Sequence, residues 1–188
     1  MKIIFLDFDG PLTNRRAWIV YDKPASRMQW TTADPVGIGM LNGLCRNQNA
    51  KIVISSTWHK IKPPNLPYDA KDARDCLRQW GFEGDIHEHW RTIDHGIRTY
   101  EILSWLDLHK EEVEYFCSID DDHLKKIVNP VIVHPEDGIG AQDYYKAKSF
   151  LSGDGVSLKK ALEKFSPDQK FAFSDFGGAE GESIYGEA

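Results

Sequence analysis

Hydrophobic residues along the chain form short runs that alternate with amphipathic stretches. Runs rich in β-branched and aromatic residues predict five strands, at residues 2–6, 51–54, 86–89, 115–119 and 131–133. Apolar residues recur at helical spacing over residues 36–46, 69–80 and 97–108, and one or two more helices are expected within 141–165. Residues 14–33 lack a clean period and are expected to be irregular. Strands that alternate with helices predict an α/β protein, a three-layer α/β/α sandwich with a mostly parallel central sheet.

Polar side chains follow three of the predicted strands where each strand ends. The first strand ends in Asp7-Phe8-Asp9, the second in Ser55-Ser56-Thr57 and the fourth in Asp120-Asp121. The carboxyl ends of parallel strands share one edge of a sheet, where ligands bind in such folds. We therefore expect four carboxylates and several hydroxyls to gather at one edge.

The chemistry of this edge favours a hard cation and a phosphate. Clustered carboxylates repel one another unless a cation is present, and a set of oxygen ligands suits Mg²⁺. Asp7 and Asp9 point to the same face of an extended chain, so that one can attack a substrate while the other handles its proton. A carboxylate nucleophile that forms an aspartyl-phosphate is an established covalent route.

Length, charge and cysteine usage limit the class of protein. The chain has 188 residues, 23 Lys and Arg against 29 Asp and Glu, and a net charge of −6. This length suits one domain, expected over residues 1–165, followed by an acidic, glycine-containing tail at 166–188, either flexible or docked. Residues 1–165 are nearly neutral, which does not support capture of nucleic acid by the electrostatic field of the whole protein.

The three cysteines lack metal-site spacing and predict buried thiols in a reducing compartment. With no apolar stretch of membrane-spanning length, we expect a cytoplasmic protein without a membrane partner.

Three motifs together resemble those of a known family, the haloacid-dehalogenase-like (HAD) phosphohydrolases. The motifs run from Asp7 to Thr13, from Ile54 to Ser56 and from Ile119 to Asp121, in the family's order and each at a strand end. The resemblance covers residues 1 to about 150. It implies a Rossmann-like, HAD-like fold. It also implies an Mg²⁺-dependent phosphatase that forms an aspartyl-phosphate.

The resemblance implies a role for each matching residue. Asp7 would be the nucleophile and a metal ligand, and Asp9 the general acid and base. Ser56 would bind the phosphoryl group, although Ser55 remains the alternative. The substrate-binding set also includes Gly10 and Thr57. The metal ligands would be Asp7, the backbone carbonyl of Asp9, Asp120 and Asp121.

The family's basic third motif is the least regular of the set. The segment from Gly96 to Leu106 is similar to an Arg-Gly-x-Glu-Ile-x-x-Trp-Leu pattern in a capless branch that includes the HAD domains of RNA-repair proteins. Arg98 then takes the place of the usual lysine. The gaps between the motifs leave no room for a large cap domain, so the site is expected to be open.

Basic and aromatic residues alternate directly after the first motif, in the combination that nucleotides or single-stranded nucleic acid require. They are Arg15, Arg16, Trp18, Tyr21, Arg27 and Trp30. Arg15 and Arg16 are assigned to substrate binding, and ordinary packing and surface positions are the alternative for this stretch. A phosphorylated nucleotide or nucleic-acid end is therefore the expected substrate, and no obligate protein partner is evident. Phosphoprotein phosphatase, phosphotransferase and inactive phosphate-binding relative remain alternatives. A response-regulator-like receiver is disfavoured, because its phosphoacceptor would follow a middle strand rather than the first.

Overall fold

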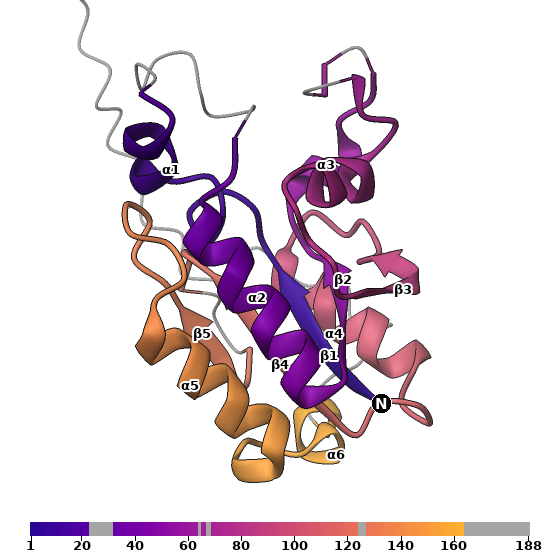
Figure 1. Ribbon diagram of the computed structural model, residues 1–188. Helices are drawn as coiled ribbons and strands as arrows, with labels where there is room; N and C mark the ends of the chain where they lie inside the picture. Colours follow the sequence, from indigo (N-terminus) through magenta and orange to yellow (C-terminus); the bar gives the residue numbers. More distant parts are fainter. Residues whose placement is uncertain (23–31, 64, 67–68, 124–126, 164–188) are drawn as a thin grey trace, which may run out of the picture.

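The computed structural model describes residues 1–22, 32–63, 65–66, 69–123 and 127–163 (Figure 1). Its centre is a five-stranded sheet in the order β3-β2-β1-β4-β5, in which every pair of neighbours is parallel. The strands are β1 (Lys2–Leu6), β2 (Ala50–Ile54), β3 (Asp85–Arg91), β4 (Tyr115–Asp120) and β5 (Pro130–Ile132). The predicted α/β class and parallel sheet are confirmed.

Helices cover both faces of this sheet. They are α1 (Arg15–Val20), α2 (Pro35–Gln48), α3 (Ala73–Gln79), α4 (Arg98–Leu108), α5 (Ala141–Ser149) and α6 (Leu158–Leu162), with a 3₁₀ turn η2 (Thr57–Lys60) and a π-helical turn η4 (Phe150–Asp154). Figure 1 shows α2 and α5 in front of the sheet and α4 behind it. Successive side chains of a strand point to opposite faces. Ile4 and Leu6 of β1 accordingly join the core beneath α2, α3 and α5, whereas Ile3 and Phe5 join the core beneath α4 and α6.

Local capping signals account for the helix ends. The Asp34 side chain accepts the backbone N–H groups of Val36 and Gly37, and Pro35 occupies the first turn, so α2 begins where the sequence predicts. Helix α3 begins at Ala73 instead of residue 69, because Asp72 is its N-cap. Gly81 follows α3 with a φ of +94°, a conformation that glycine adopts without strain.

One expectation about the fold is wrong. Residues 14–33 were expected to be irregular, but Arg15–Val20 form a short helix. Asn14 is its N-cap, since its side-chain oxygen accepts the N–H of Ala17. The helix buries only Ala17, and its exposed hydrophobic residues therefore hide the amphipathic period.

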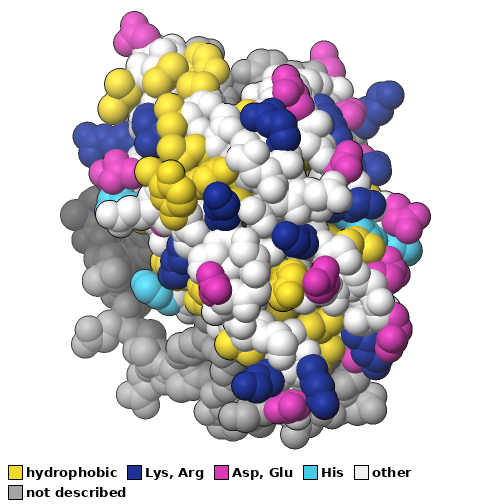
Figure 2. Space-filling view, turned by 60° about the horizontal axis from the view of Figure 1, so that its bottom comes forward, with side chains coloured by type: hydrophobic (Ala, Val, Ile, Leu, Met, Phe, Trp, Pro, Cys, Tyr) yellow, Lys and Arg dark blue, Asp and Glu magenta, His cyan; other side chains and the backbone are white. Residues whose placement is uncertain are grey.

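The segment between the second and third motifs is short, as expected for a protein without room for a large cap domain. Between Ser56 and Arg98 the described residues form η2, α3 and β3, all of which belong to the core fold. The expected tail at 166–188 lies outside the described residues. Within them, no helix has both the length and the apolar character needed to span a bilayer. Figure 2 shows basic and acidic side chains interspersed on the face that it presents, in keeping with a near-neutral body.

Candidate active site

The three polar strand ends meet at the carboxyl edge of the sheet. The ladders continue one residue past the strands, because the N–H of Asp7 donates to the carbonyl of Ile119 and the N–H of Ser55 to that of Leu6, both at 3.0 Å. Asp7 therefore lies between the ends of β2 and β4. The strand order reverses direction between β1 and β4, the position where parallel α/β sheets form ligand sites.

Arg98 joins the first and last of these strand ends. It is the first residue of α4, and its Nη1 lies 2.5 Å from Asp7 Oδ2 and 2.7 Å from Asp120 Oδ2. The side chains of Asp7, Asp120 and Arg98 are only 5%, 1% and 20% exposed. Burial opposes the charge of Arg98, but the two carboxylates outweigh it and raise the pKa of the guanidinium. The structure thus places the residue chosen for the third motif against the expected nucleophile.

One guanidinium does not balance the acids around it. Burial, together with the charge of Asp7, raises the pKa of Asp120 to about 6, even though Arg98 lowers it. The same two causes raise the pKa of Asp121. Burial is the larger cause of both shifts, and three carboxylates (Asp7, Asp120 and Asp121) stand against the one guanidinium of Arg98. The site therefore has a deficit that a bound cation can fill.

The geometry of the carboxylates fits a metal ion. Asp7, Asp120 and Asp121 each offer one carboxylate oxygen, and these oxygens lie within 4.8 Å of one another. Gly10, with a φ of +79°, makes room for them, because a Cβ atom there would lie 2.5 Å from Asp121 Cγ. An all-oxygen donor set of this kind suits Mg²⁺.

Asp9 lies at the same edge and is held by two side chains. Thr13 Oγ1 donates to Asp9 Oδ1 at 2.7 Å, and Trp58 Nε1 donates to Asp9 Oδ2 at 3.0 Å. Burial raises the pKa of Asp9 in spite of these hydrogen bonds. Trp58 is fully buried and packs edge-on against Phe8. Its role is missed from the sequence, where the only signal is its position two residues after Ser56.

The hydroxyl residues after β2 are placed in three different ways. Ser56 is fully buried and its Oγ accepts the N–H of Trp58 at 3.4 Å, so it caps η2 and keeps its own proton free to donate. Ser55 is also buried and continues the β2 ladder through its N–H. Thr57 is exposed as the first residue of η2. The arrangement supplies donors at the strand end without choosing between the two serines.

The basic residues after the first motif form contacts away from the carboxylates. Arg16 pairs with Asp34, and its Nη2 also donates to the carbonyl of Ile139 at 3.1 Å. Arg15 pairs with Glu136 at 3.3 Å in an exposed position. Trp18 is half-buried and Tyr21 exposed, while Arg27 and Trp30 lie outside the described residues. Neither described arginine of this group is brought to Asp7, in contrast to Arg98.

Comparison with known families agrees with this geometry. The family model described as the HAD domain in Swiss Army Knife RNA repair proteins matches residues 3–144. This match covers well over half of the chain, so the chain belongs to that family and, more broadly, to the HAD-type phosphohydrolases. No curated protein and no solved structure matches the chain. The family resemblance seen in the motifs is therefore confirmed.

Proposed function

We propose that the chain is an Mg²⁺-dependent phosphatase that hydrolyses phosphate monoesters through an aspartyl-phosphate on Asp7. The observation that carries the proposal is the contact of Arg98 with both Asp7 and Asp120, at the edge where Asp9 is also held. Arg98 can neutralise a phosphoryl group beside the nucleophile, and the acids around it can hold a divalent cation.

Each residue at the edge has a distinct task in this mechanism. A carboxylate oxygen of Asp7 attacks phosphorus while the bond to the leaving oxygen breaks, and Asp9 gives its proton to that oxygen. Water then attacks the phosphoryl group, Asp9 takes the proton of the water, and Asp7 is released. The raised pKa of Asp9 favours the protonated form that the first step needs.

The phosphoryl oxygens require donors and positive charge during both steps. Ser56 is the proposed hydroxyl donor and Arg98 the proposed cation, and Ser55 and Thr57 lie beside them. Asp7, Asp120, Asp121 and the backbone carbonyl of Asp9 would hold Mg²⁺. When bound, the ion supplies the positive charge that draws the phosphate toward Asp7.

We propose nucleotide or nucleic-acid phosphates as substrates. The matching family consists of HAD domains of RNA-repair proteins, and between Ser56 and Arg98 the described residues form only η2, α3 and β3. A site without a large cap can accept the end of a macromolecule. Phosphopeptides and transfer to an acceptor other than water are the alternatives that a substrate screen separates.

The direct test is Asp7→Asn with an aryl phosphate as substrate. We expect kcat to fall by more than about a thousandfold, because the covalent step loses its nucleophile. Circular dichroism and the melting temperature should show a folded protein, since one buried negative charge has been removed. Wild-type turnover should also stop in EDTA and return with added Mg²⁺. Retained activity in folded Asp7→Asn would refute the mechanism, and a wild type without turnover on any phosphate ester would indicate an inactive relative.

A further inference from the structure

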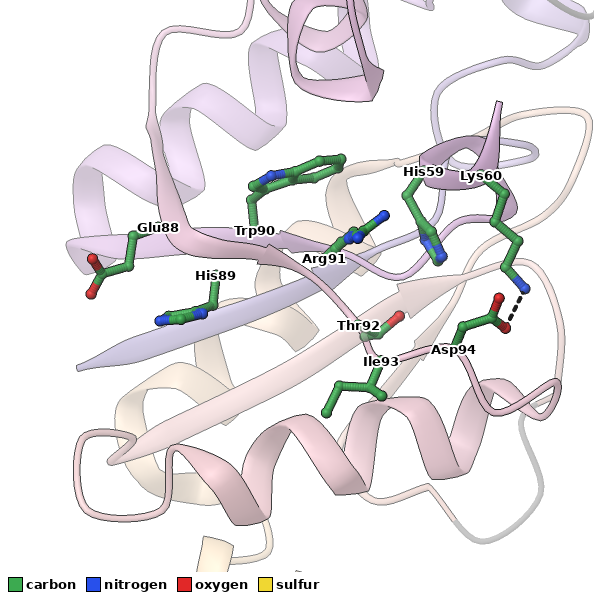
Figure 3. Close-up of a pocket in the computed structure, with 9 residues that line it drawn as sticks. All are labelled: His59, Lys60, Glu88, His89, Trp90, Arg91, Thr92, Ile93 and Asp94. Carbon is green, nitrogen blue, oxygen red and sulfur yellow. Dashed lines mark hydrogen bonds and ion pairs between the residues drawn. The ribbon is translucent and has the colours of Figure 1, made fainter. Parts of the chain in front are cut away.

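A pocket of about 510 Å³ lies beside the active site, between η2 and the edge strand β3 (Figure 3). We call it the Trp90 pocket. His59 and Lys60 line it from η2, and Trp90 and Arg91 line it from the end of β3. In Figure 3 Trp90 and Arg91 point toward His59, whereas Glu88 and His89 lie at the opposite end. Side chains from two elements thus converge on one space.

The strand register ties this pocket to the catalytic edge. Arg91 pairs with Ile54, which in turn pairs with Leu6, the residue before Asp7. Neighbouring strands lie about 4.8 Å apart, so the backbone of Arg91 is on the order of 10 Å from that of Leu6. The wall of the pocket formed by η2 also adjoins this edge, because His59 follows Ser56 by only three positions in the chain. A substrate whose phosphate reaches Asp7 can therefore extend into the pocket.

The charges in the pocket divide into engaged and available groups. Lys60 pairs with Asp94 at 2.7 Å and lies 3.9 Å from Glu101. Arg91 has no ion pair with any described residue, and its guanidinium lies 5.7 Å from the centre of the Trp90 ring. The guanidinium of Arg74 lies closer to the same ring, 4.7 Å from its centre. The pocket therefore offers one cation with free hydrogen-bond donors, placed next to an aromatic ring that the Arg74 guanidinium also approaches.

His59 adds a group that does not compete for the anion. It is buried, with a residue exposure of 8%. Burial lowers the pKa of the imidazole, and the negative charge of Glu101 offsets this only in part. A neutral ring at this position contributes surface and polarity without attracting a second phosphate.

We propose that the Trp90 pocket binds the nucleotide next to the phosphorylated end of a single-stranded nucleic acid, an inference that rests on the proposed phosphatase function. A base can stack on the planar guanidinium of the exposed Arg91, with the half-buried Trp90 ring beside it, and Arg91 can contact the adjoining phosphate. Every base has a flat face that can stack, so we expect the pocket to favour phosphorylated ends of single-stranded nucleic acid without a preference for their base sequence. A simple aryl phosphate reaches Asp7 without using this pocket.

Two substrates and an exposed arginine provide the test. Arg91→Glu should lower kcat/KM for a 3′- or 5′-phosphorylated oligonucleotide by about tenfold or more, and leave kcat/KM for an aryl phosphate within about twofold of wild type. Trp90→Phe keeps a ring for stacking and should have a smaller effect on the oligonucleotide. Arg46→Glu, an equal charge change on the exposed last turn of α2, is the matched control and should change neither substrate.

A binding measurement separates failure of the pocket from failure of the chemistry. Fluorescence anisotropy with a labelled, phosphorylated oligonucleotide is measured on Asp7→Asn, with and without Arg91→Glu, so that turnover is not needed. Weaker binding in the double variant, but not with Arg46→Glu, supports the pocket even if the phosphatase mechanism fails. Unchanged binding, an equal loss on the aryl phosphate, or tighter Arg91-dependent binding of a phosphopeptide would overturn the inference.

Discussion

Two arginine–aspartate clusters at the same end of the molecule differ in their balance of charge. Asp34 has one arginine, Arg16, and its carboxylate also accepts the N–H groups of Val36 and Gly37. Arg98 instead serves two carboxylates, Asp7 and Asp120. The first cluster is satisfied by the protein itself, whereas the second keeps an excess of negative charge.

This difference separates a structural pair from a candidate active site. Both arginines are basic residues near the first motif in space, and the sequence alone gives Arg16 the closer position to it. Satisfied hydrogen bonds leave Asp34 without capacity for a ligand, and it caps α2. Raised pKa values of Asp120 and Asp121 beside Arg98 mark buried carboxylates that also repel Asp7.

The strongest test of the comparison is Arg98→Met. Removal of the guanidinium leaves Asp7 and Asp120 buried against each other, and we expect a loss of about 3 kcal/mol in the free energy of unfolding at pH 7. Activity on an aryl phosphate should fall by about a hundredfold or more. Urea denaturation and steady-state kinetics measure the two effects. The double variant with Asp120→Asn should regain stability but not activity, and a stable Arg98→Met would contradict the charge argument.

The satisfied cluster should respond through stability alone. Asp34→Ala removes the N-cap of α2 and the partner of Arg16, with an expected cost of about 2 kcal/mol. Because Asp34 contacts Arg16 and the first turn of α2 rather than Asp7, kcat on an aryl phosphate should change little at a temperature where the variant is folded. Denaturant unfolding and kinetics on the same preparation check this. Asp34→Asn should retain part of the cap and hence part of the stability.

The unbalanced cluster should also give stability a pH dependence in metal-free buffer. The pKa of Asp120 is about 6 in the folded chain, against about 3.9 for an unfolded aspartate. Between these pH values the folded chain holds a proton that the unfolded chain has lost. Its free energy of unfolding therefore falls as the pH rises, by at most about 1.4 kcal/mol per pH unit for this group. Urea titrations in EDTA should show the slope, and Asp120→Asn should reduce it.

The smallest effects come from adjacent arginines in different surroundings. Arg15→Ala breaks an ion pair in which both side chains are more than half exposed, and should cost less than about 0.5 kcal/mol. Arg16→Ala should cost more, because it removes the partner of a buried carboxylate. Thermal melts of the two variants make a matched comparison. If either variant stays folded at the assay temperature but loses turnover of a phosphorylated oligonucleotide, the expectation that these residues bind substrate would be restored.

Local patterns were sufficient for most of the fold. The β-branched runs predict the strands, and Asp34-Pro35 predicts the start of α2, because these signals act within a few residues. Helix α1 is not predicted from the sequence because its exposed residues include hydrophobic ones. A helix is recognised in a sequence by the regular alternation of polar and apolar positions, which α1 lacks. The start of α3 lies four residues after the predicted one for a different reason. Asp69 and Asp72 are both capable caps, and only Asp72 accepts the N–H groups of the first turn.

The sequence by itself determined which residues have the chemistry for the proposed reaction and at which strand ends they stand. The three motifs, their order and the family follow from it. Only the tertiary structure placed Arg98, the residue that the family resemblance already assigned to the third motif, against Asp7, because this ion pair joins residues 91 positions apart. The same holds for Trp58 and Asp9, and for the Trp90 pocket beside them. Such contacts depend on the sheet order and on the packing of helices, which no local pattern encodes.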